Sequence, residues 1–165
     1  MKSRVKCLEC GAPMKETRET RPYDLCGLKN VILHGVVIRR CTRCENDEIG
    51  IPRTDQLHRM IARAFIEKET RLTGDEVRFL RKTLGWSGAD FAGHMGVAEE
   101  TVSRWENDAA PIGPQADRLL RLIVAQDEFT ARYPTQRLCR IDPKKAKNTR
   151  LELKAGEDRW KLLSA

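Results

Sequence analysis

Two pairs of cysteines constrain this chain more than any other feature. Cys7 and Cys10 form the first pair and Cys41 and Cys44 the second, with two residues inside each pair and 30 residues between the pairs. Two intervening residues allow a tight turn in which both sulfurs face one ion, and four thiolates fill a tetrahedral coordination shell without leaving a position for water. The spacing therefore predicts one structural zinc ion, bound by Cys7, Cys10, Cys41 and Cys44. A redox-active C-x-x-C motif is the alternative, but it would not need a matching second pair.

Cysteine usage also bears on the compartment in which the chain works. Four of the six cysteines belong to these pairs, which favours metal binding in a reducing compartment over disulfides in a secreted protein. The chain has no stretch of about 18 apolar residues and no apolar run after its first charges. We expect a cytoplasmic protein with no membrane partner. Cys26 and Cys139 lack partners at ligand spacing and are expected to be buried, inert thiols.

The region between the cysteine pairs has the composition of a small sheet. Residues 30–41 are rich in β-branched side chains and are interrupted by Gly35, which predicts a strand or a bent hairpin arm. An earlier arm is expected over residues 16–23. A domain of this size buries little apolar surface, so metal binding is expected to supply much of its folding free energy. A helix is predicted over residues 52–69, and the polar stretch 68–73 is the expected domain boundary.

A second segment, residues 86–111, predicts two short helices joined by a tight turn. Ser87 begins a capping-box-like pattern at the start of the first helix, and Gly96 supplies the left-handed residue that ends it. The apolar pattern resumes with Val102 and Trp105, three residues apart, while the intervening positions are polar. The second helix is therefore expected to be amphipathic, with a polar outer face.

Further helices are expected on both sides of this unit. Thr73 and Glu76 form a capping box, and residues 115–129 carry apolar side chains at helical spacing behind two prolines. The expected fold class is α+β, with a small zinc-stapled N-terminal β domain, an all-α helix-turn-helix domain of five helices and a candidate C-terminal β-hairpin. The expected domains are residues 1–70, 71–134 and 135–165.

The central segment resembles the helix-turn-helix of the Cro and phage-repressor family, often called XRE-like. The matching residues stand as A-x-x-x-G-V-x-x-x-x-V-S-R-W-E, from Ala92 to Glu106. In that family the second helix lies in the DNA major groove. This resemblance makes the candidate DNA contacts Glu99, Glu100, Thr101, Ser103, Arg104 and Asn107.

The residue types at these positions indicate how DNA would be read. Arginine at position 104 can make paired hydrogen bonds to guanine O6 and N7, whereas a glutamate can accept a hydrogen bond from cytosine N4 but repels phosphate. Ala98 occupies the cap position of the second helix and cannot cap it by its side chain.

The combination of a two-pair cysteine ribbon with this helix-turn-helix resembles the MqsA family of antitoxins, also described as YgiT-type zinc-finger regulators. The resemblance covers the chain from Cys7 to about Phe129. It implies that the zinc domain binds a cognate toxin, an mRNA-cleaving ribonuclease in the best-known case. It also implies that the helix-turn-helix domain forms a homodimer, binds double-stranded operator DNA and represses its own operon. Glu100 stands where the better-known member of this family has an asparagine, so the operator sequence is expected to differ.

The net charge of +7 suits a nucleic-acid partner in sign but is unevenly distributed. Residues 1–70, 71–133 and 134–165 carry net charges of +4, −2 and +5, so the candidate DNA-reading region is the only acidic section. Phosphate neutralisation supplies much of the affinity for DNA, so we expect dimerisation or the basic ends to help hold the duplex. Candidate phosphate contacts are Ser87, Lys144, Lys145, Lys147 and Arg150. A solvated surface is the alternative for the basic run.

The last segment alternates apolar and polar residues around the sequence A-G-E-D, which predicts a hairpin over residues 151–162. Its apolar face is expected to pack either on the helical domain or on a second copy of the chain.

Three other functions compete with a DNA-binding antitoxin. A stand-alone transcription regulator with the same architecture, but without a toxin, is the nearest. A zinc-ribbon RNA-binding adaptor is less favoured because readers of single-stranded RNA use exposed aromatic side chains, and only 5% of this chain is aromatic. An enzyme is not expected, because the cysteine set is closed and no nucleophile, base and orienting group occur at a recognisable spacing.

Overall fold

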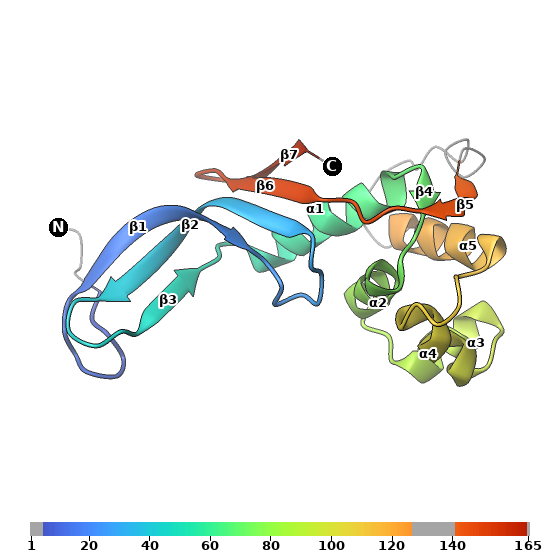
Figure 1. The fold of residues 1–165 in the computed structure, drawn as a ribbon, viewed down its shortest axis with the longest axis horizontal. Helices are drawn as coiled ribbons and strands as arrows, with labels where there is room; N and C mark the ends of the chain where they lie inside the picture. Colours follow the sequence, from blue (N-terminus) through green and yellow to red (C-terminus); the bar gives the residue numbers. More distant parts are fainter. Residues whose placement is uncertain (1–4, 127–140, 165) are drawn as a thin grey trace.

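The computed structural model describes residues 5–126 and 141–164 (Figure 1). Within these residues the fold is α+β, as predicted: a sheet that carries the four paired cysteines at one end, five helices, and C-terminal strands that return to the sheet. The expected boundary at residue 134 lies outside the described residues. In chain order the elements are β1 (Met14–Pro22), β2 (Val31–Cys41), β3 (Asp47–Gly50), α1 (Thr54–Glu67), β4 (Thr70–Arg71), α2 (Gly74–Thr83), α3 (Gly88–Met95), α4 (Glu99–Glu106), α5 (Pro114–Val124), β5 (Asp142–Ala146), β6 (Leu151–Ala155) and β7 (Trp160–Ser164).

The five-stranded sheet is built on β2. β1 pairs with β2 in antiparallel fashion along most of its length, while two strands share the other edge of β2. β3 pairs antiparallel with residues 37–40, and β6 pairs parallel with residues 31–34. Gly35 lies between these two stretches with a φ of 72°, a conformation that glycine adopts without strain. β2 is therefore one continuous strand whose halves have different neighbours.

The C-terminal hairpin is present as β6 and β7, with Leu153 opposite Leu162. Its location differs from both expectations, because β6 joins the N-terminal sheet instead of the helical region or a second copy. The physical reason is apolar continuity across the sheet. Leu151 and Leu153 lie opposite the buried Val31 and Leu33 of β2, and both leucines are completely buried.

α1 joins the sheet to the other helices (Figure 1). Its buried side chains include Leu57, Ile61 and Phe65 at helical spacing, as predicted. They belong to one continuous core that contains residues of β2 and β6 as well as residues of α2 to α5. None of the described helices combines the length and apolar character that crossing a membrane requires.

The remaining helices begin and end close to their predicted limits. Thr73 and Glu76 form the predicted capping box at the start of α2. α5 begins with Pro114 in its first turn and ends at Val124, so residues 127–129 of the predicted helix lie outside the described residues. β4 pairs in parallel with β5, which brings the C-terminal segment to the junction between α1 and α2.

His34 links three strands of the sheet. It lies on β2, where its Nδ1 atom is 3.0 Å from Oγ1 of Thr20 on β1. Its Nε2 atom is 3.0 Å from Oε2 of Glu152 on β6. This histidine therefore has a structural role, because it links the C-terminal hairpin to the rest of the sheet.

His58 and His94 also take part in packing. Nε2 of His58 on α1 is 2.9 Å from the hydroxyl oxygen of Tyr23 at the end of β1, and its ring meets the edge of Phe79 on α2. The ring of His94 on α3 stacks on Trp86, with 3.9 Å between the ring centroids. Neither histidine lies in the cysteine cluster described below.

Candidate functional site

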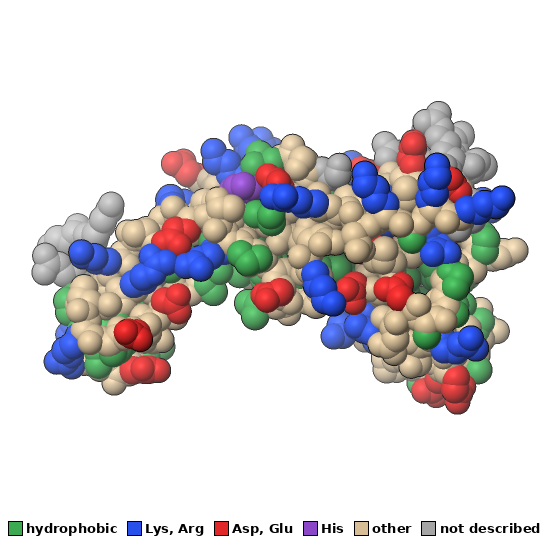
Figure 2. Space-filling model, in the orientation of Figure 1, with side chains coloured by type: hydrophobic (Ala, Val, Ile, Leu, Met, Phe, Trp, Pro, Cys, Tyr) green, Lys and Arg blue, Asp and Glu red, His purple; other side chains and the backbone are tan. Residues whose placement is uncertain are grey.

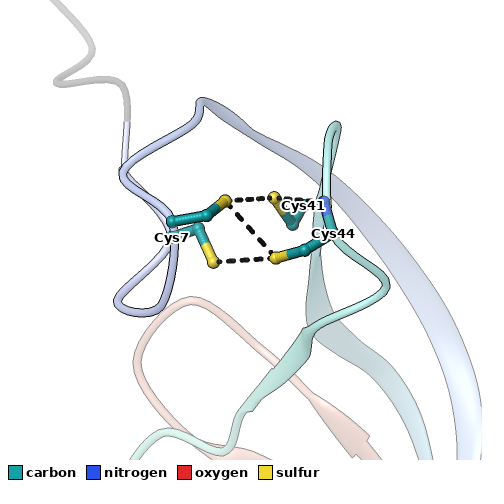
Figure 3. Close-up of side chains that lie close together, drawn as sticks. Cys7, Cys41 and Cys44 are labelled. Carbon is teal, nitrogen blue, oxygen red and sulfur yellow. Dashed lines mark hydrogen bonds between the residues drawn. The ribbon is translucent and has the colours of Figure 1, made fainter.

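The four paired cysteines converge at the end of the sheet farthest from α2 to α5 (Figures 1 and 3). Cys7 and Cys10 precede β1, Cys41 ends β2, and the antiparallel pairing of these strands places Met14 opposite Cys41.

All four sulfurs lie within 4.8 Å of one another. The Sγ distance is 3.3 Å from Cys44 to Cys10, 3.4 Å from Cys10 to Cys41 and 3.6 Å from Cys7 to Cys44. A tetrahedral zinc ion with Zn–S bonds of about 2.3 Å would separate its sulfurs by about 3.8 Å. The cluster therefore fits a structural metal such as zinc.

Hydrogen bonds shape both cysteine turns. The amide of Gly11 donates to the carbonyl of Cys7 at 2.9 Å, and its φ of 68° turns the chain toward β1. In the second turn, the amides of Arg43 and Cys44 both lie 3.3 Å from Sγ of Cys41 and donate to it. The guanidinium of Arg43 also donates to the carbonyl of Cys10 at 2.6 Å, which fastens one turn to the other. The turns are thus fixed by the backbone as well as by the sulfurs.

The cluster ionises unevenly. The side-chain amide of Asn46, followed by the backbone of Cys10, lowers the pKa of the Cys7 thiol to about 6 by hydrogen bonding to its sulfur. At Cys44 the backbone of Asn46 lowers the pKa, but hydrogen bonds with Cys10 and Cys41 outweigh it and raise the pKa to about 12. The negative charge of the sulfurs that ionise first thus opposes ionisation of the Cys44 thiol. A bound cation supplies the positive charge that lets all four cysteines act as thiolates, and four sulfur ligands make such a site structural.

Cys26 takes no part in this cluster. It is half-buried in the loop between β1 and β2, and its sulfur donates to the carbonyl of Tyr23 at 3.5 Å. Burial raises the pKa of the Cys26 thiol, which makes it inert at neutral pH, in agreement with its predicted role. Cys139, the other thiol predicted to be inert, lies outside the described residues.

The two short helices predicted around Gly96 are α3 and α4. Oγ of Ser87 accepts a hydrogen bond from the amide of Asp90 at 3.1 Å, and Oδ2 of Asp90 accepts one from the amide of Ser87 at 2.9 Å. This is the predicted capping box. Gly96 ends α3 with a φ of 65°, and Ala98 precedes α4 without a side-chain cap. The local signals in the sequence therefore gave the limits of both helices.

One side of α4 is held against α2. Val102 and Trp105 are buried, and so is Glu106. The Glu106 carboxylate accepts hydrogen bonds from Nε of Arg81 at 2.5 Å and from Nε of Arg78 at 3.3 Å, both on α2. These ion pairs of Glu106 were not predicted from the sequence. The available signal was that Glu106 follows Trp105 on the buried side of an amphipathic helix, where a carboxylate needs a positively charged partner.

The start of α2 lies directly against the end of α4. A Cβ atom at Gly74 would be 2.6 Å from the carbonyl oxygen of Trp105 and 2.8 Å from that of Glu106. The amide of Gly74 donates to Oδ1 of Asp108 at 2.8 Å. Only glycine permits this approach of the two backbones.

The candidate DNA contacts on α4 differ in how freely their side chains can act. Asn107 is committed within the protein, because its Nδ2 donates to the carbonyl of Ser103 at 2.9 Å and its Oδ1 accepts from Arg78 at 2.8 Å. The side chains of Glu100 and Arg104 have no hydrogen-bond or ion-pair partner among residues 5–126 and 141–164. The exposed candidates are Glu99, Glu100, Ser103, Arg104 and Asn107, while Thr101 is half-buried.

The candidate phosphate contacts do not form one surface with α4. Ser87 is close to it, at the start of α3. Lys144 and Lys145 belong to β5, which lies on the opposite side of the helical region from α3 and α4 (Figure 1). Lys147 and Arg150 lie between β5 and the sheet. The structure therefore keeps the basic segment away from the helix expected to read DNA.

Four charged residues lie close together at the junction between α1, α2 and α5, and this clustering was not predicted from the sequence. We call Lys68, Glu76, Asp117 and Arg121 the junction cluster. Arg121 is fully buried and donates to Asp117 and to backbone carbonyls of residues 65, 66, 68 and 70. Nζ of Lys68 donates to Oε2 of Glu76 at 2.5 Å. The polar stretch 68–73 was expected as a domain boundary. It is an ordered connection that is hydrogen-bonded to α2 and to α5.

Comparison with known proteins assigns the chain to no family. No protein-family model matches the sequence, and neither the curated proteins nor the solved structures gave a significant match.

Proposed function

We propose that this protein is a sequence-specific transcription regulator that binds double-stranded DNA with α4. The observation that carries this proposal is the arrangement of α3, the Gly96 turn and α4. The buried side of α4 is clamped to α2 through Glu106, while its polar side is exposed. A helix presented in this way can enter the major groove, which is about 12 Å wide, without unfolding any other part of the protein.

Arg104 is the residue expected to contribute most to base reading. Its exposed side chain has no hydrogen-bond or ion-pair partner in the part of the chain that the structure describes, and a guanidinium can bind guanine through two hydrogen bonds. We expect Arg104→Ala to weaken specific DNA binding by about 1–3 kcal/mol without changing the fold. Lys82→Ala is the matched control, because it removes the same charge from an exposed position on α2. Fluorescence anisotropy with the DNA upstream of the gene measures both affinities, and equal values for the two variants would contradict the assignment.

The resemblance to the MqsA antitoxins supports a second part of the proposal. We infer that zinc occupies the cysteine cluster, that this end of the sheet binds a cognate toxin, and that a homodimer represses its own operon. The cluster lies at the opposite end of the molecule from α3 and α4 (Figure 1). A partner bound at the cysteine end would therefore leave α4 accessible to DNA.

Native mass spectrometry of the protein co-expressed with the product of its neighbouring gene tests this second part. A stoichiometric small partner that dissociates when the metal is chelated supports an antitoxin. A zinc-loaded dimer that binds DNA but no partner contradicts the toxin partner and favours the stand-alone regulator.

A further inference from the structure

The outermost face of α4 carries two charges of opposite sign that have no side-chain partner among the described residues. Val102 and Trp105 define the buried side of the helix. With about 3.6 residues per turn, Glu100 and Arg104 both lie opposite that side, one turn apart and about 40° from each other around the helix axis. Both side chains are exposed.

No other charged side chain of α4 shares this position. Glu106 is buried and paired with Arg78 and Arg81. Glu99 is exposed, but it is turned about 100° from Glu100, toward the side of Glu106. A groove entered by α4 would therefore meet Glu100 and Arg104 first.

Figure 2 shows acidic side chains at the end of the molecule where Figure 1 draws α3 and α4. Such charge is unfavourable for general DNA binding, because carboxylates near phosphates raise the free energy of the complex. A carboxylate in the major groove is satisfied only by a donor on a base edge. Cytosine offers its N4 amino group for this purpose. Adenine also has an amino group, but its neighbouring N7 acceptor repels a carboxylate, and guanine offers the O6 and N7 acceptors that an arginine binds.

We propose that Glu100 and Arg104 act together as a two-residue reader that requires a cytosine amino group and a guanine at neighbouring base pairs. This inference rests on the proposed function. Arg104 supplies attraction to guanine. Glu100 makes binding conditional, because any base without a suitably placed amino group leaves its carboxylate unpaired beside the phosphates. Glu100 thus lowers the affinity for most sequences and raises the selectivity for one.

A structural role in α4 is the competing explanation for the glutamates. Both Glu99 and Glu100 lie in the first turn, where negative charge is favourable to the helix dipole, and Ala98 provides no side-chain cap. That role would apply to the two residues equally. A base-reading role applies to Glu100 alone, so Glu99→Gln is a matched control for Glu100→Gln.

The experiment uses the full-length, metal-loaded protein and a library of duplexes with a randomised central segment. Bound sequences are selected and read for the natural protein, Glu100→Gln, Glu99→Gln and Arg104→Ala. The affinity of each protein is then measured for the selected duplex, for a scrambled duplex, and for a selected duplex in which the key cytosine is replaced by N4-methylcytosine. The one remaining amino hydrogen of this base pairs with guanine, so a methyl group takes the place of the hydrogen that faces the major groove.

We expect the natural protein to select a cytosine and a guanine at adjacent base pairs. Glu100→Gln should lose the cytosine preference, discriminate by roughly 5- to 150-fold less at that position, and bind the scrambled duplex more tightly. Glu99→Gln should select the same DNA sequence as the natural protein. The methylated duplex should weaken binding of the natural protein more than that of Glu100→Gln.

The possible failures can be told apart. If the natural protein selects a sequence but Glu100→Gln selects the same one, the two-residue reader is wrong and DNA binding stands. If the natural protein binds no duplex above the level of Arg104→Ala, the proposed function itself is wrong. An equal loss of cytosine preference in Glu99→Gln and Glu100→Gln would assign the glutamates to the helix and overturn the inference.

Discussion

Arg121 and Asp117 form an ion pair that is withdrawn from water, with side chains that are 0% and 2% exposed. They lie one turn apart on α5. Asp117 also accepts a hydrogen bond from the amide of Leu72 at 2.9 Å, while Arg121 binds four carbonyls between α1 and β4. This pair therefore fastens α5 to the end of α1 and to the connection between α1 and α2.

Breaking this pair should be costly. We expect Asp117→Ala to lower the free energy of unfolding by about 3–5 kcal/mol, because it leaves the guanidinium of Arg121 buried without a countercharge. Asp75→Ala is the control, since Asp75 makes a partly exposed pair with Arg78 at 3.5 Å and such pairs contribute about 0–1 kcal/mol. Urea unfolding measures both values, and similar losses would show that the junction cluster contributes little.

Gly74 provides a steric prediction. We expect Gly74→Ala to destabilise the protein by about 1–3 kcal/mol, because the new methyl group would press against the carbonyl oxygens at the end of α4. Gly88→Ala, at the start of α3, meets no atom within 4 Å and should be neutral or slightly stabilising. Thermal unfolding of the two variants distinguishes these outcomes. Equal melting temperatures would mean that α2 and α4 do not approach as closely as described.

Removing one cysteine of the cluster should affect only one end of the sheet. Cys41→Ser is expected to lose the bound metal and to loosen residues 5–14 and 41–50, while the core around β6 stays protected by buried side chains. Metal analysis and amide hydrogen exchange measure these effects. Cys26→Ser should keep the full metal content, and retention of metal by Cys41→Ser would refute the ligand assignment.

His58 makes stability depend on pH in one direction. Burial lowers the pKa of its imidazole below the usual value of about 6.5, although nearby Asp55 raises it. The unfolded chain therefore binds a proton more readily than the folded one. The contribution of neutral His58 to stability is fully present above pH 6.5 and is lost as the pH falls through the interval between the unfolded and the folded pKa.

Urea unfolding at pH 7.5, 6.5 and 5.5 tests this dependence. The natural protein should lose stability across the series, and His58→Gln should lose less because glutamine does not titrate. His94→Gln, which changes an exposed histidine, should behave like the natural protein. An identical pH dependence in all three proteins would contradict the role of His58.

The basic segment gives a prediction about DNA geometry. Because β5 lies on the opposite side of the helical region from α4, replacing Lys144, Lys145 and Lys147 with Ser should leave the salt dependence of DNA binding unchanged. A shallower dependence of the affinity on salt concentration would show that these lysines contact phosphate. Substitution is a better test than deletion of residues 135–165, which would also remove two strands of the sheet.

Features determined by neighbouring residues could be predicted from the sequence. The turns of the cysteine cluster, the capping box of Ser87 and the end of α3 at Gly96 each depend on a few adjacent residues whose conformational preferences agree. The start of α1 shows where such rules fail. Arg53, whose side chain cannot cap a helix, occupies the cap position with a φ of 49°, and its guanidinium donates to the carbonyls of residues 156 and 157.

Features determined by distant partners could not be predicted. The alternation in residues 151–162 indicated a hairpin, but no local signal says that β6 lies parallel to β2. The buried charges of Glu106 and Arg121 read as surface residues in the sequence, because their partners come from other helices or from the connection after α1. The candidate site was therefore predicted where it is local, and the packing that supports it was not.

The parallel pairing of β2 with β6 has a consequence for the order in which the protein is completed during synthesis. The cysteine turns and β1 to β3 leave the ribosome first, so a metal ion can be captured early. Residues 31–34 must wait for partners 120 positions later in the chain, after α1 to α5 have emerged. Until then an apolar strand edge stays open to incorrect pairing with other chains. A nascent chain that stalls before residue 151 is therefore already able to bind metal and is still prone to aggregate.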